Sequence, residues 1–202
     1  MPSRWLLLLI GLGAFGLGAW LALGPGAPKE PETKAGYVLD EARALPALSL
    51  IDEQGQPFTN ADFEGQWSLL YFGFTYCPDI CPSALGVMAQ IKRELDDDAS
   101  INDHYFLVSV DPERDTPERL REYVQYFDPS FQAVTGEFAQ LDQFTRTAGA
   151  IYRLPEERAG EDYQVAHSST LTLINPQGRL HAVFTAPFDA QLIAQDLQQL
   201  AR

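Results

Sequence analysis

The sequence predicts an α/β fold in which helices cover both faces of a mixed central sheet. Two continuous apolar runs, Gln66–Phe74 and Tyr105–Val110, have the composition of strands that are buried on both faces. Amphipathic helical segments alternate with the predicted strands, which is typical of an α/β sandwich. Two further apolar runs flank the turn at Asn175–Gly178 and predict a hairpin, so the sheet contains antiparallel as well as parallel strands.

The remaining elements follow from local patterns. A helix is expected to begin near Asp115, because Pro117 suits the first helical position and acids suit the first turn. In chain order the predicted elements are strands at Leu48–Ile51 and Phe58, the strand Gln66–Phe74, a helix at Ser83–Leu95, the strand Tyr105–Val110, a helix from Asp115 to Phe127, a strand at Phe131–Val134, a helix at Glu137–Ala150, strands at Thr170–Ile174 and Leu180–Thr185, and a helix at Asp189–Leu200. A thioredoxin-like three-layer sandwich is the simplest arrangement of this order.

An uncharged stretch of 20 residues, 5–24, precedes these elements. A helix of that length spans about 30 Å, the thickness of a bilayer's hydrocarbon core. Because Arg4 lies before the stretch and an acidic segment follows it, the positive-inside rule predicts that the rest of the chain is exported. We therefore predict a membrane anchor at 1–24, one N-terminal transmembrane helix, a linker at 25–44 and a thioredoxin-like domain at 45–202. A cleaved signal peptide is the alternative, and it exports the domain equally.

Composition excludes several function classes. The 202 residues include 28 acidic and 14 basic side chains, a net charge of −14. This charge argues against nucleic-acid binding, which depends on Lys and Arg, and against binding to anionic lipid headgroups. The two cysteines are too few for a disulfide-stapled scaffold or a four-thiolate zinc site.

The two cysteines, Cys77 and Cys81, lie where a predicted buried strand ends and a helix begins. Ligands collect at that edge of open α/β sheets, and a helix N-terminus favours a thiolate over a thiol. Residues four apart on a helical turn lie about 6 Å apart, close enough for a disulfide or for binding one metal ion. The spacing therefore leaves redox and metal chemistry open. A purely structural disulfide is disfavoured, since closing so short a loop stabilises a fold by only about 2 kcal/mol.

A metal ion bound by two thiolates needs a further donor, and the chain has three histidines. His104 lies in a polar turn and His181 in the last predicted strand, so solvent-facing positions are expected for both, while Met88 is expected in the core. His167 is the favoured donor, because its polar stretch enters an apolar strand at the sheet edge. Two thiolates and an imidazole form a soft three-coordinate set that suits Cu(I) and also accepts Cu(II), whereas zinc normally takes a fourth donor.

Three segments of the chain form a recognisable set: Gly73–Pro82 (GFTYCPDICP), Ser109–Pro117 (SVDPERDTP) and His167-Ser168. Together they resemble the SCO/SenC family, membrane-anchored thioredoxin-fold copper proteins of cytochrome c oxidase assembly. The resemblance extends over essentially the whole predicted domain. It implies that Cys77, Cys81 and His167 are copper ligands and that the soluble domain lies on the periplasmic side of the inner membrane.

The resemblance also implies a role for Asp111, as a carboxylate that supports the metal ligands or faces a partner. One position departs from the family pattern. Ala166 stands where the family commonly has an acid immediately before the metal-binding histidine, and we expect this change to weaken copper binding or to alter the acceptor.

The sequence leads to two main functional hypotheses. The first is a copper metallochaperone, not strictly an enzyme, that delivers its ion by ligand exchange to the CuA site of cytochrome c oxidase subunit II. The second is a thiol–disulfide oxidoreductase that keeps the cysteines of that subunit reduced, with Cys77 attacking and Cys81 resolving the mixed disulfide. A peroxide-reducing protein or redox sensor also fits the fold, but no feature of the sequence singles it out.

Overall fold

The structure is a computed structural model that describes residues 5, 33–95, 104–156 and 163–201. Its strands are β1 (Gly36–Ala44), β2 (Leu50–Asp52), β3 (Pro57–Phe58), β4 (Ser68–Gly73), β5 (Tyr105–Ser109), β6 (Gln132–Thr135), β7 (Tyr152–Arg153), β8 (Ala166–His167), β9 (Thr170–Ile174) and β10 (Arg179–Thr185). The helices are α2 (Ile80–Glu94), α3 (Pro117–Phe127), α4 (Phe138–Thr147) and α5 (Ala190–Leu200), and a short 3-10 helix covers Asn60–Phe63.

A mixed sheet with the strand order β1-β10-β9-β4-β5-β6-β2-β3 forms the centre of the domain. Strand β4 pairs in parallel with β5 and antiparallel with β9, and β5 pairs in parallel with β6. Every residue of β4, β5 and β9 is buried, which explains why these strands are mostly apolar and why their few serines and threonines are small enough to pack inside. The mixed sheet and its central parallel strands are as predicted.

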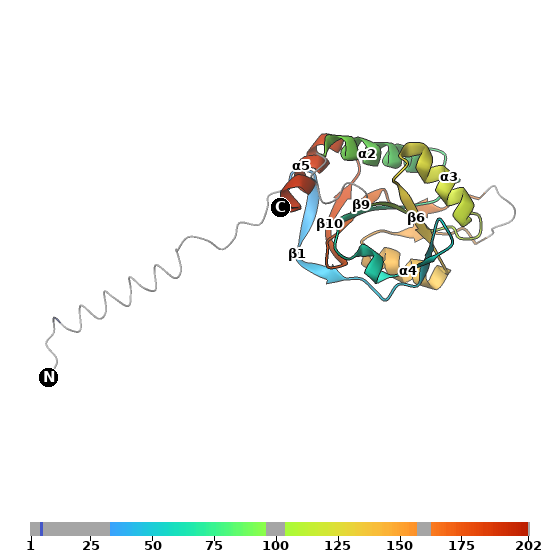
Figure 1. The fold of residues 1–202 in the computed structure, drawn as a ribbon, viewed down its shortest axis with the longest axis horizontal. Coiled ribbons are helices and arrows are strands. Elements are labelled where there is room, and N and C mark those ends of the chain that lie inside the picture. Colours follow the sequence, from blue (N-terminus) through green and yellow to red (C-terminus); the bar gives the residue numbers. More distant parts are fainter. Residues whose placement is uncertain (1–4, 6–32, 96–103, 157–162, 202) are drawn as a thin grey trace. The chain divides into compact units, whose positions relative to one another are not determined.

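Helices cover both faces of this sheet (Figure 1). Helices α2, α3 and α5 lie along one side, and α4 lies on the other. On the α4 side, the ring of Phe144 packs edge-on against Phe72 of β4, with the ring centroids 5.3 Å apart. The arrangement confirms the predicted three-layer, thioredoxin-like order of elements, although the bounds of most elements differ by one to three residues at one or both ends.

Strand β1 lies in the segment that we predicted to be a linker. Residues 36–44 pair antiparallel with β10 at the edge of the sheet, with an irregular register between Val38 and Arg43. The sequence gives little sign of this strand, because three of its nine residues are charged and none is buried, as is common in edge strands. The sheet therefore begins at Gly36, not near residue 45.

The chain divides into two units, Met1–Glu32 and the domain at Thr33–Arg202. The predicted membrane anchor falls, apart from Trp5, outside the described residues. Within the part of the chain that the structure describes, no helix has both the length and the apolar character needed to cross a bilayer.

Candidate metal centre

The two cysteines lie at the junction of β4 and α2. Helix α2 begins at Ile80, three residues before the predicted start, so Cys81 lies in its first turn and Pro82 occupies the third helical position. Pro82 is tolerated there because the first backbone N–H groups of a helix have no partner within the helix. Cys77 lies in the preceding loop, where its backbone N–H donates to the carbonyl oxygen of Phe74 at 3.3 Å.

The sulfur of Cys81 lies directly against the end of strand β4. A Cβ atom added to Gly73 would be 2.6 Å from the Cys81 Sγ and 3.1 Å from the ring of Tyr71. Real atoms do not approach so closely, so only glycine at this position leaves room for the sulfur. The fully buried Cys81 side chain is thereby fixed in place.

His167 reaches the cysteines on a small two-stranded ribbon. Strand β8 pairs with β7, so that Tyr152 lies opposite His167. The imidazole ring packs edge-on against the rings of Tyr71 and Phe74, at centroid distances of 5.9 and 5.7 Å. This ribbon could not be predicted from the sequence, because its two strands have only two residues each.

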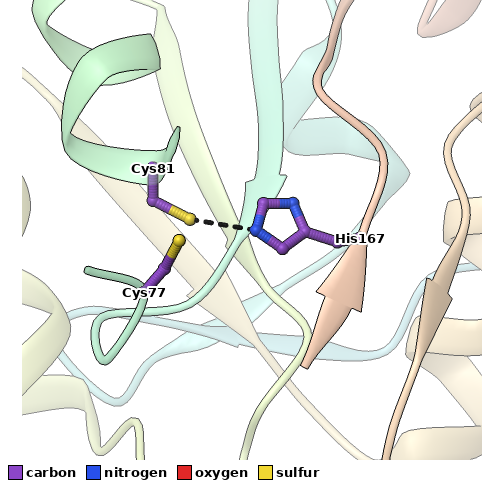
Figure 2. Close-up of side chains that lie close together, drawn as sticks. All are labelled: Cys77, Cys81 and His167. Atoms are coloured by element: carbon purple, nitrogen blue, oxygen red, sulfur yellow. Dashed lines mark hydrogen bonds between the residues drawn. The ribbon is translucent and has the colours of Figure 1, made fainter. Parts of the chain in front are cut away.

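The imidazole points toward both sulfur atoms (Figure 2). Its Nε2 atom lies 3.3 Å from the Cys81 Sγ. Its Nδ1 atom lies 3.2 Å from the carbonyl oxygen of Ser168. A carbonyl oxygen can only accept a hydrogen bond, so Nδ1 carries a proton in this contact, and in the neutral ring the Nε2 lone pair is free to bind a metal ion on the side of the sulfurs.

The three donor atoms are close enough to hold one ion. The two Sγ atoms and the Nε2 atom all lie within 4.8 Å of one another. Metal–sulfur and metal–nitrogen bonds of about 2.0–2.3 Å place three donors in a plane roughly 4 Å apart. Small shifts of the side chains therefore suffice for coordination, and two thiolates with an imidazole favour a soft ion. Among the described residues, this is the cluster of histidine, cysteine and carboxylate donors with that geometry.

The two sulfurs have different acid–base properties. Hydrogen bonds from the side chains of Cys81 and His167, together with backbone N–H groups at the start of α2, outweigh burial and lower the pKa of Cys77 to about 4. Burial raises the pKa of Cys81, and the neighbouring Cys77 thiolate raises it further. Cys77 is therefore the thiolate and Cys81 the thiol when the pair is reduced, and Cys77 is also the more accessible of the two, at 8% against 0% exposure.

The other candidate donors lie elsewhere. His181 is half-buried in β10, with its ring edge-on to Trp67 at 5.0 Å, and burial lowers its pKa. The Nδ1 atom of His104 lies 3.4 Å from the hydroxyl of Ser68. Met88 is fully buried, as predicted for a core residue. Neither histidine belongs to the three-donor cluster.

The loop before Cys77 is held by the buried carboxylate of Asp115, a residue that the sequence indicates only as the start of a helix. Asp115 accepts hydrogen bonds from the backbone N–H and the hydroxyl of Thr75, at 3.0 and 2.6 Å, and from the hydroxyl of Ser109 at 2.6 Å. The Thr75 hydroxyl also accepts from Arg119 Nε at 2.6 Å. Burial raises the pKa of Asp115 despite these bonds. Asp115 lies 40 residues after Thr75 along the chain, so the sequence alone does not show that it holds the cysteine loop.

Asp111 does not have the exposed position that a partner-facing carboxylate needs. Its side chain is completely buried, where it accepts hydrogen bonds from Arg114 Nε at 2.6 Å and from the Tyr163 hydroxyl at 2.5 Å. The structure therefore corrects the partner-facing part of the prediction, because no surface of the carboxylate is left for another protein to contact. Asp111 also lies outside the three-donor cluster, so it can act on the ligands only through its neighbours.

These features define a thioredoxin-like domain with a three-donor site able to hold a soft metal ion. The SCO1/SenC family model matches residues 39–202, and the chain belongs to this family. The human mitochondrial protein SCO2 homolog is 35% identical over 196 residues, which cover 96% of this chain and 74% of the human protein. A SCO2-like protein of Rickettsia prowazekii is 34% identical over 190 residues, 93% of this chain and 90% of that protein.

Solved structures of related proteins have the same fold. The copper-bound ScoI of Arabidopsis thaliana matches with a TM-score of 0.68 and 30% identity, over 76% of this chain and 98% of that chain. The apo form of Sco1 from Thermus thermophilus matches with a TM-score of 0.72 and 32% identity, over 87% of this chain and 99% of that chain. These similarities agree with the thioredoxin-like architecture.

Proposed function

We propose that this chain binds one copper ion through Cys77, Cys81 and His167. The observation that carries the proposal is the convergence of two sulfurs and one imidazole nitrogen within 4.8 Å. The set is soft and three-coordinate, which suits Cu(I) and can also take Cu(II). The related ScoI of Arabidopsis thaliana binds copper in its crystal structure, which supports the same assignment.

In the proposed role the chain is a metallochaperone and copper is its cargo. A three-coordinate ion leaves room for an incoming ligand before an old one departs, so the ion can pass to an acceptor with similar donors by ligand exchange. His167 and Cys77 are the more accessible ligands and Cys81 the enclosed one, so we expect Cys81 to be the last to release the ion. By analogy with the family, the acceptor is the CuA site of cytochrome c oxidase subunit II.

We place the domain, by the charge pattern around 5–24, on the exported side of the inner membrane, joined to an N-terminal anchor.

The position of Ala166 bears on which protein accepts the copper. Its side chain is exposed next to His167, so an acid there would face solvent and an approaching protein rather than the sulfurs. We therefore attribute this departure from the family to a change in the docking surface, not to a loss of copper affinity.

A thiol–disulfide oxidoreductase is the second candidate, and the asymmetry of the cysteine pair favours it. A reactive thiolate at Cys77 beside a buried thiol at Cys81 is the arrangement of an attacking and a resolving cysteine. In that mechanism the Cys77 thiolate attacks a partner disulfide and Cys81 then releases the partner as a dithiol. The protein is oxidised and must be reduced again by an external dithiol. His167 has no required part in that reaction.

Anaerobic titration of the reduced domain with Cu(I) against a competing chelator tests the proposal. We expect one ion per chain with a Kd far below micromolar. His167→Ala should weaken binding about 100-fold, equivalent to about 2.7 kcal/mol, while the rate of disulfide exchange at Cys77 changes little, because the hydrogen bond from Cys81 that most lowers the Cys77 pKa remains. His104→Ala is the matched control, since His104 lies outside the three-donor cluster. Binding that is unaffected by His167→Ala would remove this residue from the ligand set and favour the oxidoreductase.

A further inference from the structure

Arg114 is a buried cation close to the metal centre. Its side chain is only 6% exposed, and its Nε donates to Asp111 Oδ2 at 2.6 Å. Its Nη1 donates to the backbone carbonyl oxygen of Tyr163 at 2.9 Å. Burying an ion pair has a large desolvation cost, and apolar residues of similar size often give equal stability. The pair therefore calls for an explanation other than stability of the fold.

Tyr163 is attached to this ion pair at three points. Besides accepting at its carbonyl, it donates its hydroxyl to the Oδ1 of Asp111 at 2.5 Å. The guanidinium carbon of Arg114 lies 3.5 Å from the centroid of the Tyr163 ring, which is well within cation–π range. Tyr163 is the fourth residue before His167, and Val165 between them is buried. The segment that delivers the imidazole is therefore fixed to the 111–114 turn.

The same guanidinium contacts the segment that carries the first cysteine. Its carbon lies 4.7 Å from the ring of Tyr76, which immediately precedes Cys77, and 5.5 Å from the ring of Phe74. The Phe74 ring in turn packs edge-on against the His167 imidazole. Arg114 is thus the side chain that touches both the loop before Cys77 and the segment before His167.

We propose that Arg114 and Tyr163 are positioning residues for copper binding: they hold the imidazole-bearing segment against the cysteine loop. This inference rests on the proposed function. The third ligand comes from a segment 86 residues after Cys81, so its approach has to be fixed by contacts of this kind before the ion arrives. Neither residue belongs to the donor cluster, and both act through the backbone that they fix.

Tyr163→Phe is the most selective test. It removes the hydroxyl bond to Asp111 and keeps the ring next to the guanidinium. We expect the Cu(I) affinity of the folded protein to fall about tenfold, the lower end of the effect of residues that support metal ligands. In the metal-free protein, amide hydrogen exchange across 166–168 should become faster. The rate of disulfide exchange at Cys77 should not change. The matched control is Tyr126→Phe, a tyrosine that is 84% exposed on α3, and it should change none of these readouts.

Arg114→Lys is the second variant. Lysine keeps the positive charge, but it lacks the planar guanidinium group. That group donates hydrogen bonds to both Asp111 and the Tyr163 carbonyl oxygen and stacks on the Tyr163 ring. We expect a larger loss of Cu(I) affinity than for Tyr163→Phe, and again faster amide exchange across 166–168 without metal. Because lysine keeps the positive charge, the buried Asp111 carboxylate still has a cationic partner, and we expect the variant to fold.

The outcomes separate this inference from the proposed function. If the wild-type protein does not bind Cu(I), the proposed function fails. If the wild type binds and both variants bind equally well with unchanged amide exchange, the positioning role is refuted. A lower melting temperature with unchanged copper affinity of the folded variants would likewise refute it, since the residues would then only support the fold. Slower disulfide exchange at Cys77 in Tyr163→Phe would also contradict a role specific to the imidazole.

Discussion

The Nε2 atom of His167 lies 3.3 Å from the Sγ atom of Cys81, although 86 residues separate the two along the chain. Three structural features produce this contact. Helix α2 begins early enough to place Cys81 in its first turn, Gly73 leaves space for the sulfur, and the β7–β8 ribbon directs the imidazole toward it. Each feature can be altered separately, which makes the account of the site testable.

Replacing Gly73 tests the close approach of the sulfur to the strand. In Gly73→Ala the new methyl group would lie 2.6 Å from the Cys81 Sγ, so the sulfur has to move away from the other donors. We expect Cu(I) affinity to fall at least about tenfold, equivalent to about 1.4 kcal/mol. Gly86→Ala on α2 is the matched control, because an added Cβ there meets nothing within 4 Å. Equal copper affinity in the two variants would show that the sulfur does not need this space.

The low pKa of Cys77 predicts an unusual pH dependence of alkylation. A thiol with a pKa of about 4 remains ionised as the pH falls from 8 to 5, so the iodoacetamide reaction at Cys77 should keep a constant rate over that range. Cys81 should not react in the folded protein, since burial raises its pKa and leaves it inaccessible. Mass spectrometry of the labelled peptides gives both rates. A rate at Cys77 that falls about tenfold per pH unit below 8 would instead indicate an ordinary thiol.

Asp115→Asn tests the support of the cysteine loop. The amide can accept fewer hydrogen bonds than the carboxylate, and one of the donors at Thr75 or Ser109 is left buried without a partner. We expect the free energy of unfolding to fall by about 2 kcal/mol and copper binding to weaken with it. Urea unfolding measures the first effect. The control is Asp142→Asn, an exposed partner of Arg146, where we expect a change below about 0.5 kcal/mol.

Truncation tests the observed start of the domain. A chain of residues 33–202 keeps β1, and it keeps the hydrogen bonds that the buried Asp196 accepts from the backbone N–H groups of Lys34 and Ala35. A chain of residues 45–202 loses both and exposes the edge of β10. We expect the shorter chain to be less stable by several kcal/mol, or to aggregate. Equal urea midpoints for the two chains would support the linker that the sequence suggested.

The central fold could be predicted because strands that are buried on both faces consist mainly of apolar residues, which the sequence shows directly. Strands β4 and β5 lie in the two continuous apolar runs, and Thr116-Pro117 marks the start of α3 with a capping side chain and a proline at the first helical position. Strand β1 and the β7–β8 ribbon show no such apolar pattern. Strand β1 is largely exposed, the ribbon is very short, and both are defined by the strands with which they pair.

That Cys77, Cys81 and His167 lie together could also be predicted, since few residues of the chain can bind a soft ion. The contacts that hold those donors could not. Asp115 bonds to Thr75 across 40 residues, and Tyr163 bonds to Asp111 across 52. Such pairs become visible only when the fold brings the segments together. Burial of Asp111 is a similar case, because a polar turn in the sequence suggests an exposed carboxylate.

X-ray absorption at the copper edge tests the central claim most directly. For the Cu(I)-loaded wild-type domain we expect two sulfur donors and one nitrogen donor, at bond lengths of about 2.0–2.3 Å. In His167→Ala the nitrogen contribution should disappear while both sulfurs remain. A nitrogen donor that persists in His167→Ala, or fewer than two sulfurs in the wild type, would contradict copper binding by Cys77, Cys81 and His167.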